Sequence, residues 1–211
     1  MRLPKTAHTS RPWRIHELTR DFEVEDVWRL PTPGGSDDLG QLVQQFTSRE
    51  KGGRKLPVVL RALFVIRWKL GGLLGWDKPD SGVGERVHSL RDRLPADLLE
   101  MARGPDVPAV PGRESNDCQP VFRSVYLTHN EWAAELANKT VHAVLHLGWV
   151  PDDSGSGYHA QMAVLVKPNG KFGKAYMAAI KPFRYALVYP MLLQSIGRRW
   201  RLRPSKESRC E

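Results

Sequence analysis

Two histidines, His142 and His146, stand four residues apart in a stretch of alternating apolar residues. Residues four apart on a β-strand point to the same side, so the two imidazoles share one face of a sheet. If that face lined a cavity, the pair could act as an acid and a base or bind a metal ion. The apolar face of the same strand, formed by Leu145, Leu147 and Trp149, should meet the core, which assigns the histidines to the other, more solvated face. The pattern therefore favours a structural pair over a catalytic one.

Tyrosines gather towards the C-terminus, where Tyr176, Tyr185 and Tyr189 fall in a segment of helical periodicity. Their rings could line a cavity, and their hydroxyls could meet the polar group of a ligand. Ile180 and Phe183 follow Tyr176 on the same helical face. Core packing is the alternative, which is favoured for Phe183, whereas the two interpretations are evenly balanced for Tyr176. If the protein is an enzyme, Tyr176 and His142 are the first residues to test.

Three basic residues lie beside apolar helical faces. Arg67 borders the apolar arc of a helix predicted over residues 56–75, so it needs a carboxylate partner if it points inward. The candidate partners are Glu23, Glu25, Asp26 and Glu135. Arg67 is then either part of a structural ion pair, which is favoured, or an anchor for an anionic ligand. Lys181 and Arg184 flank the tyrosine face and could receive a carboxylate or phenolate, although such residues are more often solvated.

Several classes of enzyme leave signatures that this sequence lacks. Cys118 and Cys210 lie in a Pro/Asp/Asn-rich stretch and near the C-terminus, so neither a disulfide framework nor a Cys–His nucleophile is indicated. No metal-ligand spacing, nucleophile elbow or phosphate-binding loop occurs. We therefore predict no metal and no cofactor. A secretory signal and a transmembrane segment are not expected either, which makes the cytoplasm the expected location.

The 211 residues fit one domain, and 41% hydrophobic and 26% charged residues are ordinary for a globular protein. The net charge of +9 is concentrated at the ends: residues 1–20 and 196–211 each carry +4, which leaves +1 for the body. A basic tail with an interleaved Trp200 could bind a nucleic acid or an anionic membrane surface. The body offers no broad basic face to extend such a contact, so nucleic-acid binding is disfavoured.

The order of predicted elements is that of an α+β protein with helices against one face of an antiparallel sheet. Residues 1–20 are basic and could be partly unstructured. The Pro/Gly-rich stretch 77–118 is either a lid or an irregular insertion. Residues 130–137 fit a short helix or a strand. The other predictions are strands over 22–30 and 121–127, helices over about 36–48, 56–75 and 96–101, a hairpin of 140–150 with 158–167, and a long C-terminal helix bent by Pro182 and Pro190.

A distinctive set of residues follows the last predicted strand. It reads Asn169, then Gly173 and Tyr176 in a Gly-x-x-Tyr spacing, then the pair Pro182-Phe183 within the long helix. This pattern resembles a bacterial family of uncharacterised function in the START-like superfamily, also called SRPBCC, polyketide cyclase or helix-grip. Residues 66–75 and the strand around His142 are similar to the family's Arg-containing second helix and its His-bearing strand. The resemblance covers roughly residues 20–200.

The resemblance implies a helix-grip fold, in which a curved antiparallel sheet wraps around a long C-terminal helix, with two N-terminal helices. Its domain organisation would be a basic segment 1–20, one START-like domain 21–200 and a basic tail 201–211. Members of the superfamily hold small, largely apolar or aromatic molecules between sheet and helix. Ligand-binding candidates are then Arg67, His146, Tyr176, Ile180 and Phe183, and a cofactor-independent cyclase, dehydratase or isomerase is one form of the function. A non-enzymatic protein that docks through its basic termini is the alternative, and the oligomeric state stays open.

Overall fold

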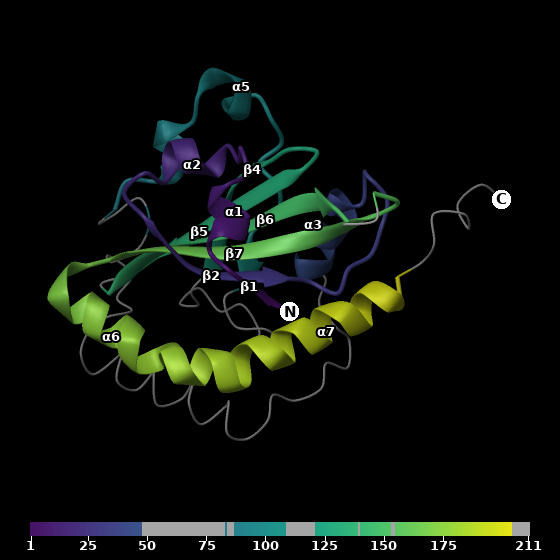
Figure 1. Ribbon diagram of the computed structural model, residues 1–211. Helices are drawn as coiled ribbons and strands as arrows, with labels where there is room; N and C mark the ends of the chain where they lie inside the picture. The colour runs from purple at the N-terminus through teal and green to yellow at the C-terminus, as the bar shows by residue number, and fades with distance from the viewer. Residues whose placement is uncertain (48–82, 84–86, 109–120, 139, 153–154, 204–211) are drawn as a thin grey trace.

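The computed structural model describes residues 1–47, 83, 87–108, 121–138, 140–152 and 155–203. Its centre is a seven-stranded antiparallel sheet with the strand order β1-β2-β7-β6-β5-β4-β3 (Figure 1). The strands are β1 (Arg2–Leu3), β2 (Glu23–Arg29), β3 (Val107–Pro108), β4 (Val121–Leu127), β5 (Glu131–Ala137), β6 (Val141–Pro151) and β7 (Tyr158–Pro168). The predicted hairpin is confirmed as β6 and β7, and residues 130–137 take the strand alternative as β5.

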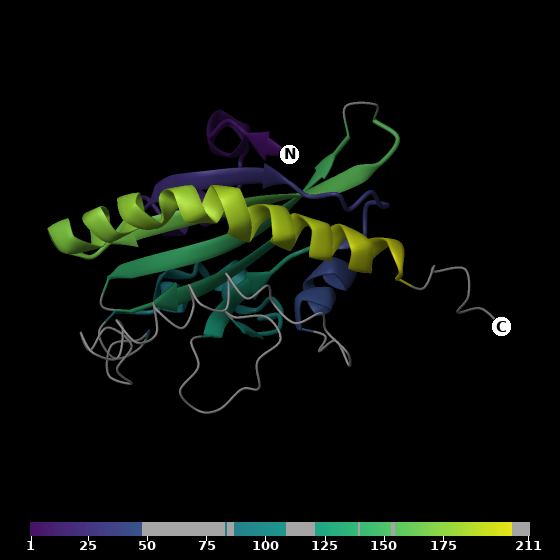
Figure 2. The same cartoon turned by 90° about the horizontal axis from the view of Figure 1, so that it is seen from below.

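A long C-terminal helix runs along one face of this sheet (Figures 1 and 2). It consists of α6 (Gly170–Phe183), a π-helical turn η3 (Arg184–Val188) and α7 (Tyr189–Arg201). Pro182 lies in the last turn of α6, and Pro190 lies in the first turn of α7, where a missing N–H costs least. The α+β class and the long final helix are therefore confirmed. The irregularity between the two prolines is a π-turn.

The prediction that helices cover one face of the sheet is wrong, because both faces are covered. Helix α3 (Leu39–Thr47) joins α7 on the first face. The other face is covered by α1 (Thr6–Thr9), α2 (Ile15–Leu18), the 3₁₀ helix η2 (Leu90–Arg93) and α5 (Ala96–Leu99). Of these, α2 and α5 stand above the sheet in Figure 1. Residues 1–20, expected to be partly unstructured, fold because Trp13, Ile15 and Leu18 bury themselves on that face.

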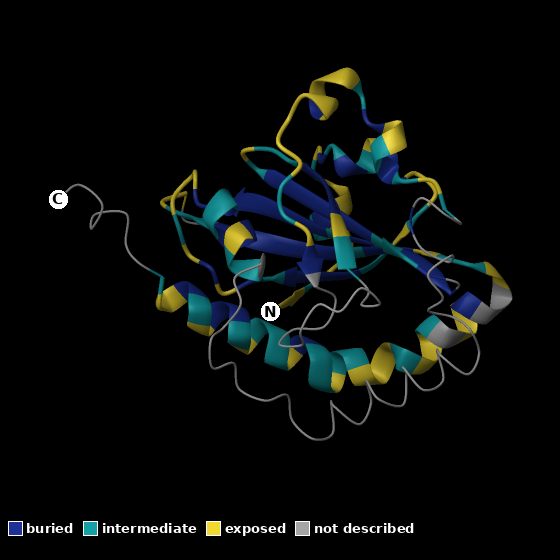
Figure 3. Cartoon of the chain, turned by 180° about the vertical axis from the view of Figure 1, so that it is seen from behind, coloured by how far each residue is buried: buried dark blue, intermediate teal, exposed yellow. Residues whose placement is uncertain are grey.

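Two hydrophobic cores result, one on each side of the sheet, and Figure 3 shows the strands buried between them. The first core contains Leu147, Trp149, Trp132, Tyr189 and Trp200, and we call its side the helix face. The second contains Val144, Val150, Ala133, Tyr126 and Leu165, and we call its side the histidine face. Alternate residues of β6 enter alternate cores, which is the parity predicted from the sequence. The helix predicted over residues 56–75 lies outside the described residues.

Candidate functional site

Two local irregularities meet where the C-terminal helix crosses β2. The pairing of β2 with β7 shifts register between Val24 and Asp26, which brings Glu25 and Asp26 together towards the helix. The π-turn η3 begins at Arg184, and Tyr189 directly follows its end. β-Bulges and π-turns both re-aim side chains and are over-represented at functional sites. We call the group formed by Glu25, Asp26, Arg184, Tyr185 and Tyr189 the Asp26 cluster.

Three side chains of the helix converge on one buried carboxylate. Asp26 is 1% exposed. The hydroxyl of Tyr189 donates to its Oδ2 at 2.7 Å, and the hydroxyl of Tyr185 donates to its Oδ1. Arg184 Nη2 lies 2.7 Å from Asp26 Oδ2 and 3.0 Å from Glu25 Oε1. The buried charge is thus paired and hydrogen-bonded, as burial of a carboxylate requires.

Both tyrosines of the cluster keep their protons. Partial burial and the adjacent Asp26 raise the pKa of Tyr185 to about 12. Burial, followed by the charge of Asp26, raises the pKa of Tyr189 further still. Because each hydroxyl hydrogen is given to Asp26, the lone pairs of each phenol oxygen remain to accept a hydrogen bond. The cluster can therefore receive a ligand group that donates, such as a hydroxyl or an amine.

Aromatic rings pack around the cluster, and a pocket opens beside it. The Trp28 ring lies 4.6 Å from that of Tyr189, and the rings of Tyr185 and Tyr189 are 5.9 Å apart. The Arg2 guanidinium lies 4.4 Å over the Tyr185 ring. A pocket of about 310 Å³ opens beside Asp26 and is lined by Arg2, Leu3, Pro4, Lys5, Glu25, Asp26 and Val27. Its volume is at the lower end for small-molecule sites.

Partly buried apolar side chains also lie on the helix face. They pack against the first core without being fully buried, and they come from β4, β6, β7, α3 and α7. The set consists of Phe46, Phe122, Leu127, Leu145, Tyr158, Leu192 and Leu193. An apolar surface with a few convergent polar groups is the usual composition of a small-molecule site.

The predicted ligand-binding residues of the C-terminal helix are spread along it. Ile180 is half-buried, and Phe183 is 49% exposed, so the prediction that Phe183 packs in the core is wrong. The backbone of Tyr176 lies in α6, and its side chain is outside the description. Arg67 also lies outside the described residues. Tyr185 and Tyr189, named as possible cavity residues, and Arg184, named as flanking them, are the ones that the structure brings together.

The two histidines lie on the histidine face, away from the C-terminal helix, and the expectation that this face is solvated is wrong. His142 is 3% exposed and His146 is fully buried. The segments around α1, α2 and η2 exclude the solvent from them. His142 is therefore separated by the sheet from α6, which carries Tyr176, and the two predicted catalytic residues come from opposite faces.

Each histidine has a carboxylate partner on the neighbouring strand β5. His142 Nε2 lies 2.8 Å from Glu135 Oε2, and His146 Nε2 lies 3.2 Å from Glu131 Oε2. Glu135 also accepts from the hydroxyl of Ser89. Sequence reasoning offered Glu135 only as a partner for Arg67 and missed Glu131. The four-residue spacing of the two glutamates, equal to that of the histidines on the next strand, was the available signal. Within the described part of the chain, no group of three or more His, Cys, Asp or Glu could hold a metal ion.

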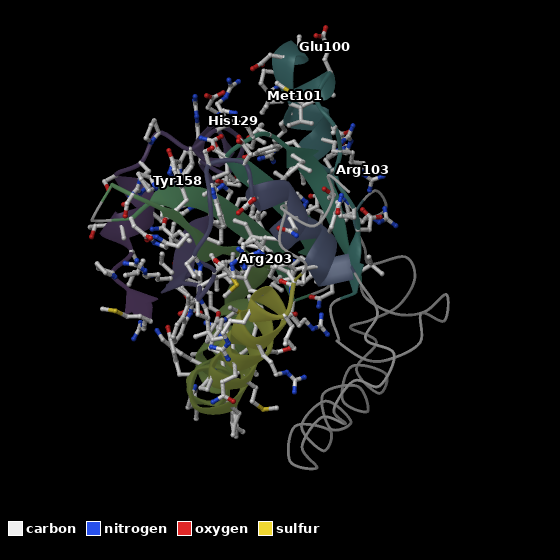
Figure 4. The ribbon with its side chains drawn as sticks, turned by 90° about the vertical axis from the view of Figure 1, so that its right-hand side faces the viewer. Glu100, Met101, Arg103, His129, Tyr158 and Arg203 are labelled. Atoms are coloured by element: carbon white, nitrogen blue, oxygen red, sulfur yellow. The ribbon has the colours of Figure 1, made fainter. Side chains whose placement is uncertain are left out.

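The basic tail is partly folded into the molecule. Trp200 is fully buried, and its Nε1 donates to the Pro33 carbonyl at 2.7 Å. The Arg203 guanidinium covers the Trp200 ring at 3.8 Å. Figure 4 shows Arg203 at the end of the C-terminal helix. Trp200 is therefore not available to stack on bases or to enter a membrane. Within the described residues, no helix has the length and apolar character needed to cross a bilayer.

Comparison with known proteins places the chain in a family. A family model described as a protein of unknown function (DUF2867) matches residues 18–191. The chain belongs to the DUF2867 family. The matched stretch contains the whole Asp26 cluster and both glutamate–histidine pairs, and it begins after α1. No curated protein and no solved structure matches the chain.

Proposed function

We propose that this DUF2867 protein is a START-like, helix-grip domain that binds a small, largely apolar or aromatic molecule on the helix face. The observation that carries the proposal is the convergence of Tyr185, Tyr189 and Arg184 on buried Asp26, within an otherwise apolar sheet–helix interface. A ligand would lay its apolar body on the aromatic rings and direct one donor group at the phenol oxygens. The cytoplasm stays the proposed location.

The cluster suits binding better than it suits a particular reaction. Its tyrosines are held protonated and its carboxylate is fully engaged, so it orients a ligand through hydrogen bonds whose direction is fixed in advance. Cyclisation, dehydration or isomerisation of the bound molecule would be promoted mainly by positioning. Of the two residues predicted to be catalytic, Tyr176 belongs to the C-terminal helix and stays a candidate. His142 is buried on the other side of the sheet, where it is bound to Glu135, so it takes no direct part in a reaction on the helix face.

The proposal is tested by a fragment titration followed by two-dimensional ¹H–¹⁵N NMR. The probes are small hydroxylated aromatic and alicyclic compounds added to the wild-type protein. We expect shifts grouped on Asp26, Trp28, Tyr185 and Tyr189, and the loss of those shifts in the double variant Tyr185→Phe/Tyr189→Phe. Tyr126→Phe is the matched control, because Tyr126 is a buried, carboxylate-bound tyrosine on the histidine face. Binding that leaves the cluster unperturbed would contradict the proposal.

A further inference from the structure

A line of three histidines ties the N-terminal segment to the histidine face. His16 Nε2 lies 3.3 Å from the carbonyl oxygen of His8, His8 Nε2 lies 3.1 Å from His146 Nδ1, and His146 Nε2 reaches Glu131. The ring of His8 is fully buried between those of His16 and His146, at centroid distances of 4.8 and 5.0 Å. Residues 1–17 precede the stretch that matches the family model, whereas His146 and Glu131 lie within it.

The hydrogen-bond partners fix where each proton sits. Burial opposes ionisation of Glu131, but hydrogen bonds from His146, the Arg14 backbone N–H and the Tyr126 hydroxyl outweigh it and lower the pKa of that carboxyl. Ionised Glu131 accepts from His146 Nε2–H, so neutral His146 presents a bare Nδ1. His8 must then donate from Nε2–H, which leaves His8 Nδ1 as a buried lone pair with no hydrogen-bond partner among the described residues.

An additional proton has no favourable place in this line. If His8 is protonated, its Nδ1–H points into the protein without an acceptor. If His146 is protonated instead, His8 Nε2 must accept, and the His8 proton moves to the same Nδ1. In either case a buried N–H is left unpaired, next to a positive charge. Burial, with His146 and His16 nearby, accordingly lowers the pKa of His8 to about 2.

The groups around His8 give it no compensating negative charge. His16 faces it from α2 and His146 from β6. Glu131 from β5 is already bound by His146, Arg14 N–H and Tyr126 of β4. The Arg14 guanidinium is engaged outside, with Glu17 and Asp97. The docked segment therefore excludes a proton that a solvent-exposed histidine accepts near pH 6.5.

We propose that residues 1–20 are a proton-sensitive cover over the Glu131–His146 pair, docked while His8 is neutral and released when His8 takes up a proton. Because the docked segment excludes the proton, the equilibrium constant for docking is at its maximum above pH 6.5. It falls by about tenfold for each pH unit below that value. From His8 alone, the open population rises ~100-fold between pH 7.5 and pH 4.5. Opening exposes an ionised carboxylate–imidazole pair to solvent. The histidine line lies on the opposite face from the Asp26 cluster, and the proposal does not rest on the proposed function. Because the same segment supplies Arg2, Leu3, Pro4 and Lys5 to the pocket beside Asp26, its release also removes one wall of that pocket.

Hydrogen–deuterium exchange read by mass spectrometry tests the cover in the full chain, with labelling times corrected for the intrinsic effect of pH. We expect the protection of peptides from residues 1–20 to fall by about 100-fold between pH 7.5 and 4.5, while the β6–β7 hairpin stays protected. His8→Phe keeps a ring and removes the titration, so its protection should not depend on pH. His88→Gln is the matched control, because the His88 side chain is 96% exposed.

Two results would overturn the cover. One is equal wild-type protection of residues 1–20 at both pH values. The other is a pH-dependent loss in His8→Phe as large as that of the wild type. If His8→Phe does not dock even at pH 7.5, His8→Gln replaces it, and the wild-type titration decides by itself whether the segment responds to protons.

Discussion

At the scale of single residues, three carboxylates that are at most 2% exposed organise the described part of the molecule, and each is held by a different set of donors. Asp26 is held by Arg184 and two tyrosines, Glu131 by His146 and Tyr126, and Glu135 by His142 and Ser89. Removing one member of such a group leaves the others unpaired in a buried site, and that loss exceeds the value of any one hydrogen bond.

Asp26→Ala should therefore cost more stability than the loss of one of its partners. It leaves Arg184 partly buried without its main counter-charge, and we expect a loss of about 3 kcal/mol in the free energy of unfolding. Tyr189→Phe removes only one donor and should cost about 1–2 kcal/mol. Urea denaturation of both variants measures the difference. An Asp26→Ala variant as stable as Tyr189→Phe would show that the carboxylate is not the centre of the cluster.

Glu135 should make stability depend on pH in the acid range. Burial opposes its ionisation, but hydrogen bonds from His142, Ser89 and the Leu90 N–H prevail and lower its pKa from 4.5. A carboxylate with a lowered folded pKa stabilises above its unfolded pKa and loses that contribution as pH falls through the folded value. Glu135→Gln should thus be less stable than the wild type at pH 7 by about 2 kcal/mol, and the gap should shrink below pH 4.5. Unfolding curves at pH 7 and 3.5 test this, and a constant gap would contradict it.

At the scale of elements, the start of the C-terminal helix is fixed by two residues of the pattern singled out in the sequence. Asn169 N–H donates to the Thr140 carbonyl at 2.8 Å, and its side-chain amide donates to the Asn138 carbonyl. A Cβ on Gly173 would lie 2.2 Å from the Thr140 carbonyl oxygen. The asparagine and the glycine are therefore explained by the close approach of α6 to the turn between β5 and β6.

Gly173→Ala should push α6 away from that turn, because the atom it meets is backbone and cannot rotate aside. We expect a loss of about 1–3 kcal/mol in stability. Gly40→Ala in α3 is the matched control, since its Cβ would meet nothing within 4 Å and should stabilise the helix by about 0.5–1 kcal/mol. Thermal unfolding of the two variants should shift in opposite directions. If Gly173→Ala leaves the unfolding temperature unchanged, the backbone around Thr140 moves aside without cost, and the prediction is contradicted.

Elements with a clear period could be predicted from the sequence, and contacts between distant segments could not. Alternating apolar residues on both sides of a turn predicted the β6–β7 hairpin, and the 3.6-residue repeat of apolar residues predicted the long C-terminal helix. Helices α1 and α2 have four residues each, too few to show a period, so the second layer of the molecule was missed. The Asp26 cluster joins residues 158 positions apart through a bulge and a π-turn, neither of which leaves a periodic signal.

At the scale of the whole molecule, the excess positive charge is concentrated at the two ends of the chain, and the segment between them carries a net charge of only +1. Arg20 and Arg201 are exposed members of the two basic ends, and reversing both leaves the Asp26 cluster untouched. Arg20→Glu/Arg201→Glu should therefore bind the same small molecules as the wild type. The docking alternative predicts instead that the variant loses a salt-dependent association with phosphatidylglycerol vesicles or duplex DNA. Vesicle co-sedimentation and a DNA mobility shift at two salt concentrations separate the two functions.

The central claim is that the helix face holds a small molecule by way of the Asp26 cluster. Native mass spectrometry of the protein after incubation with a cellular metabolite extract tests it most directly, with the released compound identified after denaturation. We predict a stoichiometric adduct on the wild type and on Tyr126→Phe, and its loss on Tyr185→Phe/Tyr189→Phe. The claim would be contradicted if the wild type showed only the mass of the protein alone in several extracts, or if the Tyr185→Phe/Tyr189→Phe variant retained the adduct in full.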